Sequence, residues 1–176
     1  MRIAISGTHR VGKSTLVEAL SERLPTYAAI DEVYASLEED GYELSDPPTV
    51  EDFEAQLERS IELAHELPAD AIVDRCPLDF VAYLFALDAD YDLEPRLDAL
   101  REAMARFDLV ALIRIAERDR FSPATAADAR LRTDTDEQMY RLIASDALGL
   151  ELETLEVVGS DDARVQQVLQ AMRRNV

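Results

Sequence analysis

A glycine-rich segment near the start of the chain has the composition of a phosphate-binding turn. Residues 7–14 read Gly-Thr-His-Arg-Val-Gly-Lys-Ser, which matches the spacing G-x-x-x-x-G-K-[S/T]. Glycines let backbone N–H groups turn toward an anion, and the start of a following helix adds the positive end of its dipole. Lys13, the only lysine of the chain, would reach the outer phosphates, and the Ser14 hydroxyl would bind Mg²⁺. The residues expected to bind a nucleoside triphosphate are Gly7, Arg10, Gly12, Lys13, Ser14 and Thr15.

Two pairs of charged residues, Asp31-Glu32 and Asp74-Arg75, each come directly after a predicted strand. Glu32 would accept the proton of an attacking hydroxyl, unless it only caps the helix that follows. Asp74 would help to hold Mg²⁺ and is the second candidate for orienting that hydroxyl. Arg75 would grip an acceptor or a phosphate with its planar guanidinium group, unless it forms a purely structural pair with Asp74.

A cluster of arginines interrupts an otherwise acidic chain. Residues 116–133 lack an apolar period, so we expect a loop or mobile flap there. Arginines on such a flap would close over the triphosphate and stabilise the negative charge that spreads during transfer, with Arg118 and Arg120 as the strongest candidates. Acidic neighbours leave open that the cluster only forms surface ion pairs. The cluster comprises Arg114, Arg118, Arg120, Arg130 and Arg132.

A long predicted helix and the helix after it carry candidates for binding an acceptor. Gln56 lies at the edge of the apolar stripe of the first helix, and its amide has the groups to pair with the edge of a base. Phe53 and Tyr83 would stack on that base, as would Tyr34 or Phe80. Each of these side chains has an alternative as an ordinary core or backbone-bonding residue.

The elements that must position these residues alternate between short apolar runs and amphipathic segments. This alternation predicts an α/β fold with a parallel sheet covered by helices on both faces, in which ligands bind beyond the carboxyl ends of the strands. We expect strands at 3–6, 27–30, 71–73, 109–115 and 154–158, and helices at 14–24, 51–67, 79–87, 95–107, from 134 to 148 and after Ser160.

Length and composition narrow the class of protein. The 176 residues fit a single domain, 1–176, and 37 acidic against 18 basic residues give a net charge of −19. Such a field repels nucleic acids and anionic membranes. Cys76 is the only cysteine, and the longest apolar run, 80–87, is too short to span a bilayer. We therefore expect a cytoplasmic protein without nucleic-acid or membrane partners, in which the helices between 79 and 107 could pair two copies.

Other users of a phosphate-binding turn fit the sequence less well. Reading guanine usually takes an Asn-Lys-x-Asp segment, which a chain with a single lysine and a single asparagine, Asn175, cannot contain. Mechanical ATPases usually carry Asp-Glu after the third strand, where this chain has Asp74-Arg75. What remains is a small-molecule kinase, which needs an acceptor pocket and arginines around the migrating phosphoryl group.

Together these residues resemble the P-loop nucleoside and nucleotide kinase superfamily. The turn at 7–14 and the pair Asp74-Arg75 look like thymidylate kinase, and the segment 74–79 is similar to that of deoxynucleoside kinases. The order of elements is also similar to that of small ATP-binding proteins related to the nicotinamide riboside kinase domain. The resemblance implies a three-layer P-loop sandwich with strand order 2-3-1-4-5 and a short arginine-bearing lid near 116–133. It also implies that Glu32 is the base and that Gln56 reads the acceptor.

The expected function is transfer of the γ-phosphoryl group of Mg-ATP to a small nucleoside-like or nucleotide acceptor. Lys13, Arg118 and Arg120 would stabilise the migrating group. Two alternatives stay open: a nucleotide-binding ATPase or sensor that acts through a protein partner, and a kinase of a nucleic-acid end, which the net charge disfavours.

Overall fold

A parallel sheet forms the centre of the computed structural model, which describes residues 1–116 and 123–174. Within these residues the sheet has five strands in the order β2-β3-β1-β4-β5. Every neighbouring pair is parallel. The strand order confirms the expected α/β fold of the P-loop type. The strands are β1 (Arg2–Ser6), β2 (Ala28–Ile30), β3 (Ala71–Asp74), β4 (Leu109–Ile113) and β5 (Thr154–Val157).

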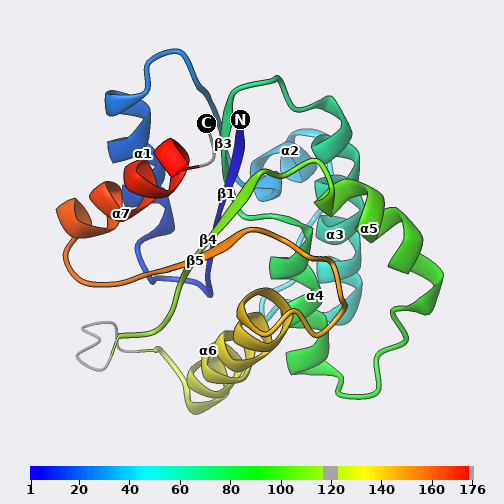
Figure 1. Ribbon diagram of the computed structural model, residues 1–176. Coiled ribbons are helices and arrows are strands. Elements are labelled where there is room, and N and C mark those ends of the chain that lie inside the picture. The colour runs from blue at the N-terminus through cyan, green and yellow to red at the C-terminus, as the bar shows by residue number, and fades with distance from the viewer. Residues whose placement is uncertain (117–122, 175–176) are drawn as a thin grey trace.

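Helices cover both faces of this sheet, with α1 and α7 on one face and α2 to α5 on the other (Figure 1). The alternation of side chains along a strand divides the core accordingly: Ile3 and Ile5 of β1 pack with α1 and α7, whereas Ala4 packs with α3 and α4. None of the helices in the described part of the chain is both long and apolar enough to cross a membrane. The helices are α1 (Lys13–Arg23), α2 (Val33–Glu39), α3 (Val50–Glu66), α4 (Pro77–Leu87), α5 (Leu97–Met104), α6 (Ala126–Met139) and α7 (Asp161–Arg174), with short turns η1 (Glu94–Arg96) and η2 (Tyr140–Ala144).

Local sequence signals explain where the helices around the site begin. Thr49 and Asp52 form a reciprocal capping box at the start of α3. Pro77 opens α4, where its fixed φ suits the first helical position and its missing N–H costs no hydrogen bond. Two residues on, Asp79 accepts from the backbone N–H of Cys76 at 3.0 Å and so closes a second capping box. The start of α4 is thereby fixed directly after β3.

Helix α6 begins earlier than the sequence indicates. The expectation of a loop over 116–133 is wrong from Ala126 onward, because Thr125 caps a helix there through the N–H of Asp128. Its buried face is largely polar, with Arg132, Thr135 and Asp136 beside Met139, so the apolar period that would have marked it is missing. The chain then continues as the π-helical turn η2 and leaves it at Ser145, short of the expected end at 148.

Candidate functional site

The phosphate-binding motif forms the turn between β1 and α1, at the carboxyl edge of the sheet. At Gly7 a Cβ would lie 2.5 Å from the carbonyl oxygen of Ile113 in β4, so any side chain there would collide with backbone. Gly12, at the start of α1, has a φ of +95°, which L side chains rarely adopt. The two glycines are therefore required by the close approach of β4 and by the left-handed turn.

This turn borders a cavity of about 400 Å³. Lys13 is only 4% exposed, and burial, followed by the charge of Arg75, lowers the pKa of its ammonium group to about 8. Its Nζ donates to the carbonyl oxygen of Thr8 at 3.1 Å and lies 3.7 Å from Glu32 Oε1. Most of the residues predicted to bind the triphosphate meet here. The lining residues are His9, Arg10, Gly12, Lys13, Ser14, Thr15, Glu32 and Arg75.

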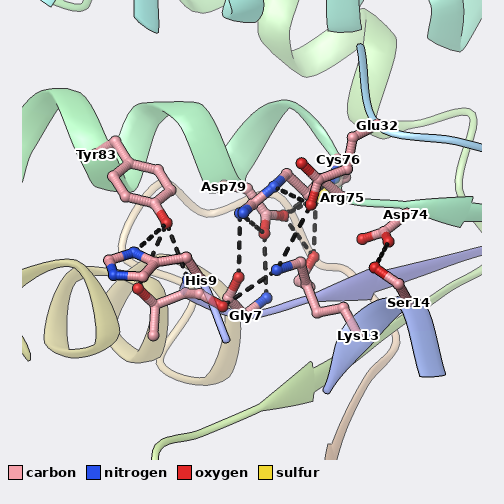
Figure 2. A network of polar contacts seen from close by, with 12 residues as sticks. Gly7, His9, Lys13, Ser14, Glu32, Asp74, Arg75, Cys76, Asp79 and Tyr83 are labelled. Atoms are coloured by element: carbon pink, nitrogen blue, oxygen red, sulfur yellow. Dashed lines mark hydrogen bonds and ion pairs between the residues drawn. The ribbon is translucent and has the colours of Figure 1, made fainter. Parts of the chain in front are cut away.

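Glu32 and Arg75 are brought together from the ends of two adjacent strands, β2 and β3 (Figure 2). Arg75 Nε donates to Glu32 Oε1 at 2.9 Å, and Arg75 Nη1 donates to the carbonyl oxygen of Gly7 at 3.1 Å. Arg75 has a left-handed φ of +77°, a strained backbone conformation for a bulky residue. Glu32 occupies the N-cap position of α2, but its side chain makes no capping hydrogen bond to that helix. Both predicted residues face the cavity.

Ser14 and Asp74, the two residues expected to hold Mg²⁺, lie in direct contact. Ser14 Oγ donates to Asp74 Oδ2 at 2.8 Å. Asp74 Oδ1 is buried and has no hydrogen-bond partner among the described residues. Burial raises the pKa of this carboxyl group, against the opposing influence of Lys13 and Ser14. The described residues include no group of three or more His, Cys, Asp or Glu side chains placed to hold a metal ion. One hydroxyl and one carboxylate fit a cation that takes its remaining ligands from water and phosphate, as Mg²⁺ does.

Asp79 is hydrogen-bonded to the phosphate-binding turn and is more than a helix cap. Its carboxylate is fully buried and accepts from Ser6 Oγ at 2.7 Å and from the Gly7 N–H at 3.1 Å. Arg75 Nη1 lies 3.5 Å from the same carboxylate. Because these donors come from β1, the turn and the end of β3, one carboxylate joins three parts of the site. Figure 2 shows this network.

Three of the residues predicted to bind an acceptor lie outside the cavity at the turn. Tyr83 accepts from the N–H of His9 at 3.0 Å through its hydroxyl oxygen, and its ring stacks on Phe53 with centroids 4.5 Å apart. Gln56 donates from Nε2 to the carbonyl oxygen of Asp52 at 3.1 Å, one turn earlier in α3. Phe53, Gln56 and Tyr83 are all buried, and none of them lines this cavity or the one beside it.

A second cavity of about 310 Å³ opens beside the first and shares Ser14 and Glu32 with it. Tyr34, one of the aromatic residues singled out from the sequence, lies on its wall and is 44% exposed. The wall lies between α1 and the start of α2, and its other residues are Val17, Glu18, Asp31, Ala35 and Asp74. Glu32 therefore stands at the junction of the two spaces.

The arginine cluster divides into three parts. Arg118 and Arg120 lie outside the described residues. Arg130 pairs with Asp134 on the surface of α6, as the ion-pair alternative expects, whereas Arg114 pairs with the buried Asp136 as well as with the exposed Glu137. Arg132 instead turns inward: its Nε donates to the carbonyl oxygen of His9 at 3.0 Å.

Sequence reasoning missed two contacts of the turn with distant residues. Arg164 of α7 donates from Nη1 to the carbonyl oxygen of Val11 at 3.0 Å. His9 lines the first cavity, and its Nε2 lies 3.2 Å from Asp128 Oδ1 of α6. Arg164 is separated from Val11 by 153 positions along the chain, so no local spacing indicates the contact. The available sequence signal was an arginine next to the apolar stripe of Val165 and Val168.

The chain belongs to the AAA_28 family, described as an AAA domain, which it matches over residues 2–164. No curated protein matched it in sequence. Among solved structures, thymidylate kinase from Candida albicans is similar at 17% identity with a TM-score of 0.65, over 99% of this chain and 91% of that one. Deoxyadenosine kinase from M. mycoides is similar at 16% identity with a TM-score of 0.63, over 99% of both chains.

The NadR protein, in a complex with NAD and AMP-PNP, is similar at 17% identity with a TM-score of 0.68. That likeness covers 99% of this chain but 49% of NadR, so this chain spans about half of that protein. At these identities the comparisons establish the fold, which is the P-loop nucleoside and nucleotide kinase fold. The fold that the resemblance implied is thereby confirmed.

Proposed function

We propose that the protein is a Mg-ATP-dependent phosphotransferase that moves the γ-phosphoryl group to a hydroxyl of a small nucleoside-like or nucleotide acceptor. One observation carries the proposal: Lys13, Glu32 and Arg75 converge on one cavity at the phosphate-binding turn. A cation for the transferring group, a carboxylate for the hydroxyl proton and a rigid guanidinium that holds the carboxylate are the parts that phosphoryl transfer needs.

Binding of the donor depends on the turn and on Lys13. The N–H groups of the turn and of the first turn of α1 would surround the β- and γ-phosphates. Lys13 Nζ would leave the Thr8 carbonyl, 3.1 Å away, for the phosphate oxygens, where a full negative charge is the stronger acceptor. Ser14 and Asp74 would hold Mg²⁺, which when bound neutralises charge on the phosphates.

Transfer follows from the position of Glu32 between the two cavities. An acceptor hydroxyl beside Glu32 gives its proton to the carboxylate while its oxygen forms a bond to the γ-phosphorus. The bond from the γ-phosphorus to the β,γ-bridging oxygen breaks, and ADP leaves with that electron pair. Arg75 keeps the carboxylate in place through its 2.9 Å hydrogen bond, and Lys13 stabilises the charge on the migrating group.

An acceptor screen with purified protein, Mg²⁺ and labelled ATP tests the proposal. We expect one class of nucleoside or nucleotide to be phosphorylated and Lys13→Ala to lower turnover by at least about 10³-fold. Full activity of Lys13→Ala, or ATP hydrolysis that no acceptor stimulates, would contradict it. Glu22→Ala, an exposed residue of α1 away from both cavities, is the matched control.

A second candidate, a nucleotide sensor that acts through a protein partner, is favoured by one observation. Phe53, Gln56 and Tyr83, the residues expected to read an acceptor, are buried away from both cavities. A sensor would bind the triphosphate and associate with its partner only in that state, without phosphorylating any acceptor. The same screen separates the two, because only the kinase yields a labelled acceptor.

A further inference from the structure

The phosphate-binding turn is held from outside by two arginines that the proposed chemistry does not use. Arg132 Nε, from α6, donates to the carbonyl oxygen of His9, and Arg164 Nη1, from α7, donates to that of Val11, both at 3.0 Å. Both side chains are largely buried: Arg132 is 5% exposed and the Arg164 side chain 12%. Burying a guanidinium group is costly unless it is hydrogen-bonded, so these contacts fix where the two carbonyls point.

The direction of a carbonyl decides the direction of the next N–H. In a planar trans peptide the C=O of one residue and the N–H of the following residue point to opposite sides. Neither arginine lines the cavity, so the His9 carbonyl bonded to Arg132 directs the N–H of Arg10 to the opposite side, and the Val11 carbonyl bonded to Arg164 does the same for the N–H of Gly12. Arg10 and Gly12 both line the 400 Å³ cavity.

The backbone of this turn would not hold that shape unaided. Arg10 has a left-handed φ of +62°, a conformation that is costly for a residue with a side chain and that the surrounding structure must enforce, whereas Gly12 takes its φ of +95° without that cost. A Cβ on Gly12 would come within 3.1 Å of Arg164 Nη1, which shows how closely this arginine is packed against the turn. The contacts come from two different helices, α6 and α7, and reach two different carbonyls, so neither arginine can replace the other.

We propose that Arg132 and Arg164 are positioning residues that aim the N–H groups of Arg10 and Gly12 at the phosphates of the nucleotide. They act through the backbone and do not touch the reacting atoms. The inference rests on the proposed function only in that the turn binds phosphates, and it requires no particular acceptor.

Binding of inorganic tripolyphosphate, which carries neither base nor ribose, isolates this role. Arg132→Met and Arg164→Met remove the donors and keep much of the aliphatic volume. Each should raise the tripolyphosphate Kd and the KM for ATP about tenfold, and the double variant about a hundredfold, with kcat within about twofold of wild type. Arg132→Lys and Arg164→Lys, which keep a cationic donor, should recover part of the affinity. The matched controls are the exposed arginines Arg141→Met and Arg173→Met.

The outcomes separate this inference from the proposed function. Wild-type protein that fails to bind tripolyphosphate would overturn both. If wild type binds tripolyphosphate and both Met variants bind it with the same Kd, the positioning role alone would be overturned. If either variant loses thermal stability but its folded fraction keeps the wild-type Kd, that arginine only contributes to packing. This result would also overturn the positioning role. Tighter binding in the Lys variants than in the Met variants is the result a positioning role requires.

Discussion

Arg75 and Glu32 face each other across the carboxyl ends of β3 and β2, with 2.9 Å between Nε and Oε1. The same guanidinium reaches the Gly7 carbonyl at 3.1 Å through Nη1. The carboxylate proposed as base is thus tied, through one rigid side chain, to the turn proposed to bind the donor. A group that must lie within hydrogen-bond reach of an attacking hydroxyl benefits from such a fixed position.

Replacing that carboxylate should affect the chemistry and spare donor binding. Glu32→Gln keeps the size of the side chain and removes its ability to accept a proton at neutral pH. We expect kcat to fall by about 10²–10⁴-fold and the KM for ATP to change by no more than a few-fold. Steady-state kinetics with the acceptor found in the screen would measure both. Glu39→Gln, exposed at the end of α2, is the control, and a kcat equal to wild type would remove Glu32 from the reaction.

Phosphate binding should weaken above about pH 8. Burial and Arg75 lower the pKa of Lys13 to about 8 in the free protein, so it loses its charge above that pH, whereas bound phosphate favours the protonated form. The affinity for tripolyphosphate should fall by up to tenfold per pH unit above pH 8. Titration calorimetry from pH 7 to 10 would measure it. Lys13→Arg, whose guanidinium stays charged, should show a flat profile, and a flat profile in the wild type would contradict the prediction.

The same group has an opposite effect on the stability of the free protein. An unfolded lysine has its ordinary pKa of 10.5, so between pH 8 and 10.5 the unfolded chain binds more protons than the folded one. The contribution of Lys13 to the free energy of unfolding therefore increases with pH in that window. Urea unfolding of wild type and Lys13→Met at pH 8 and pH 10 isolates this contribution. The free energy of unfolding of wild type, relative to that of Lys13→Met, should be higher at pH 10 than at pH 8.

Asp74→Asn should reduce the benefit of magnesium without disturbing the turn. The amide keeps an oxygen for Ser14 but lacks the negative charge that attracts the cation. Mg²⁺ raises the affinity for ATP by some factor in each protein. We expect that factor to be at least about tenfold smaller in the variant than in wild type. Measurement in EDTA is the internal control, since the two proteins should bind ATP equally there. A difference that persists in EDTA would point to damage to the turn.

Replacing Gly7 and replacing Gly41 by alanine should lower the free energy of unfolding by different amounts. A Cβ added at Gly41 would meet no atom of the described residues within 4 Å, so only its φ of +84° opposes the substitution. Gly41→Ala should therefore cost about 1 kcal/mol. Gly7→Ala places a Cβ 2.5 Å from the carbonyl oxygen of Ile113, so β1 and β4 must shift, and we expect about 2–4 kcal/mol. Urea unfolding of both variants would show the order. Equal losses would mean that the close approach of β4 is not what requires glycine.

The fold and the grouping of the proposed donor-binding residues around the turn were predictable because their signals are local. The turn at 7–14 has a fixed spacing, and an apolar run such as 109–113 identifies a buried strand without knowledge of its neighbours. Glu32, Asp74 and Arg75 were found because residues directly after parallel strands must meet at one edge of the sheet. Their placement around the turn follows from strand order alone.

What escaped prediction depends on contacts between distant parts of the chain. Helix α6 buries Arg132 and Asp136, so a polar face packs inward where the pattern indicates solvent. Arg164 reaches the turn from a helix at the other end of the sequence. Gln56, at the edge of the apolar stripe of α3, donates to the backbone of its own helix, which is the backbone-bonding alternative that the sequence could not separate from base reading. Periodicity shows which face is buried, and only the packed structure shows what that face meets.

Arg75, Lys13, Arg132 and Arg164 hold the carbonyls of four residues of the turn before any ligand arrives. This backbone is already ordered when the protein has folded, so its conformational entropy is not lost again on binding. Capture of a triphosphate therefore needs no slow rearrangement of the turn. What opposes the encounter is the net charge of −19, which repels an anion from a distance. Added salt screens that repulsion, and association should therefore become faster as ionic strength rises.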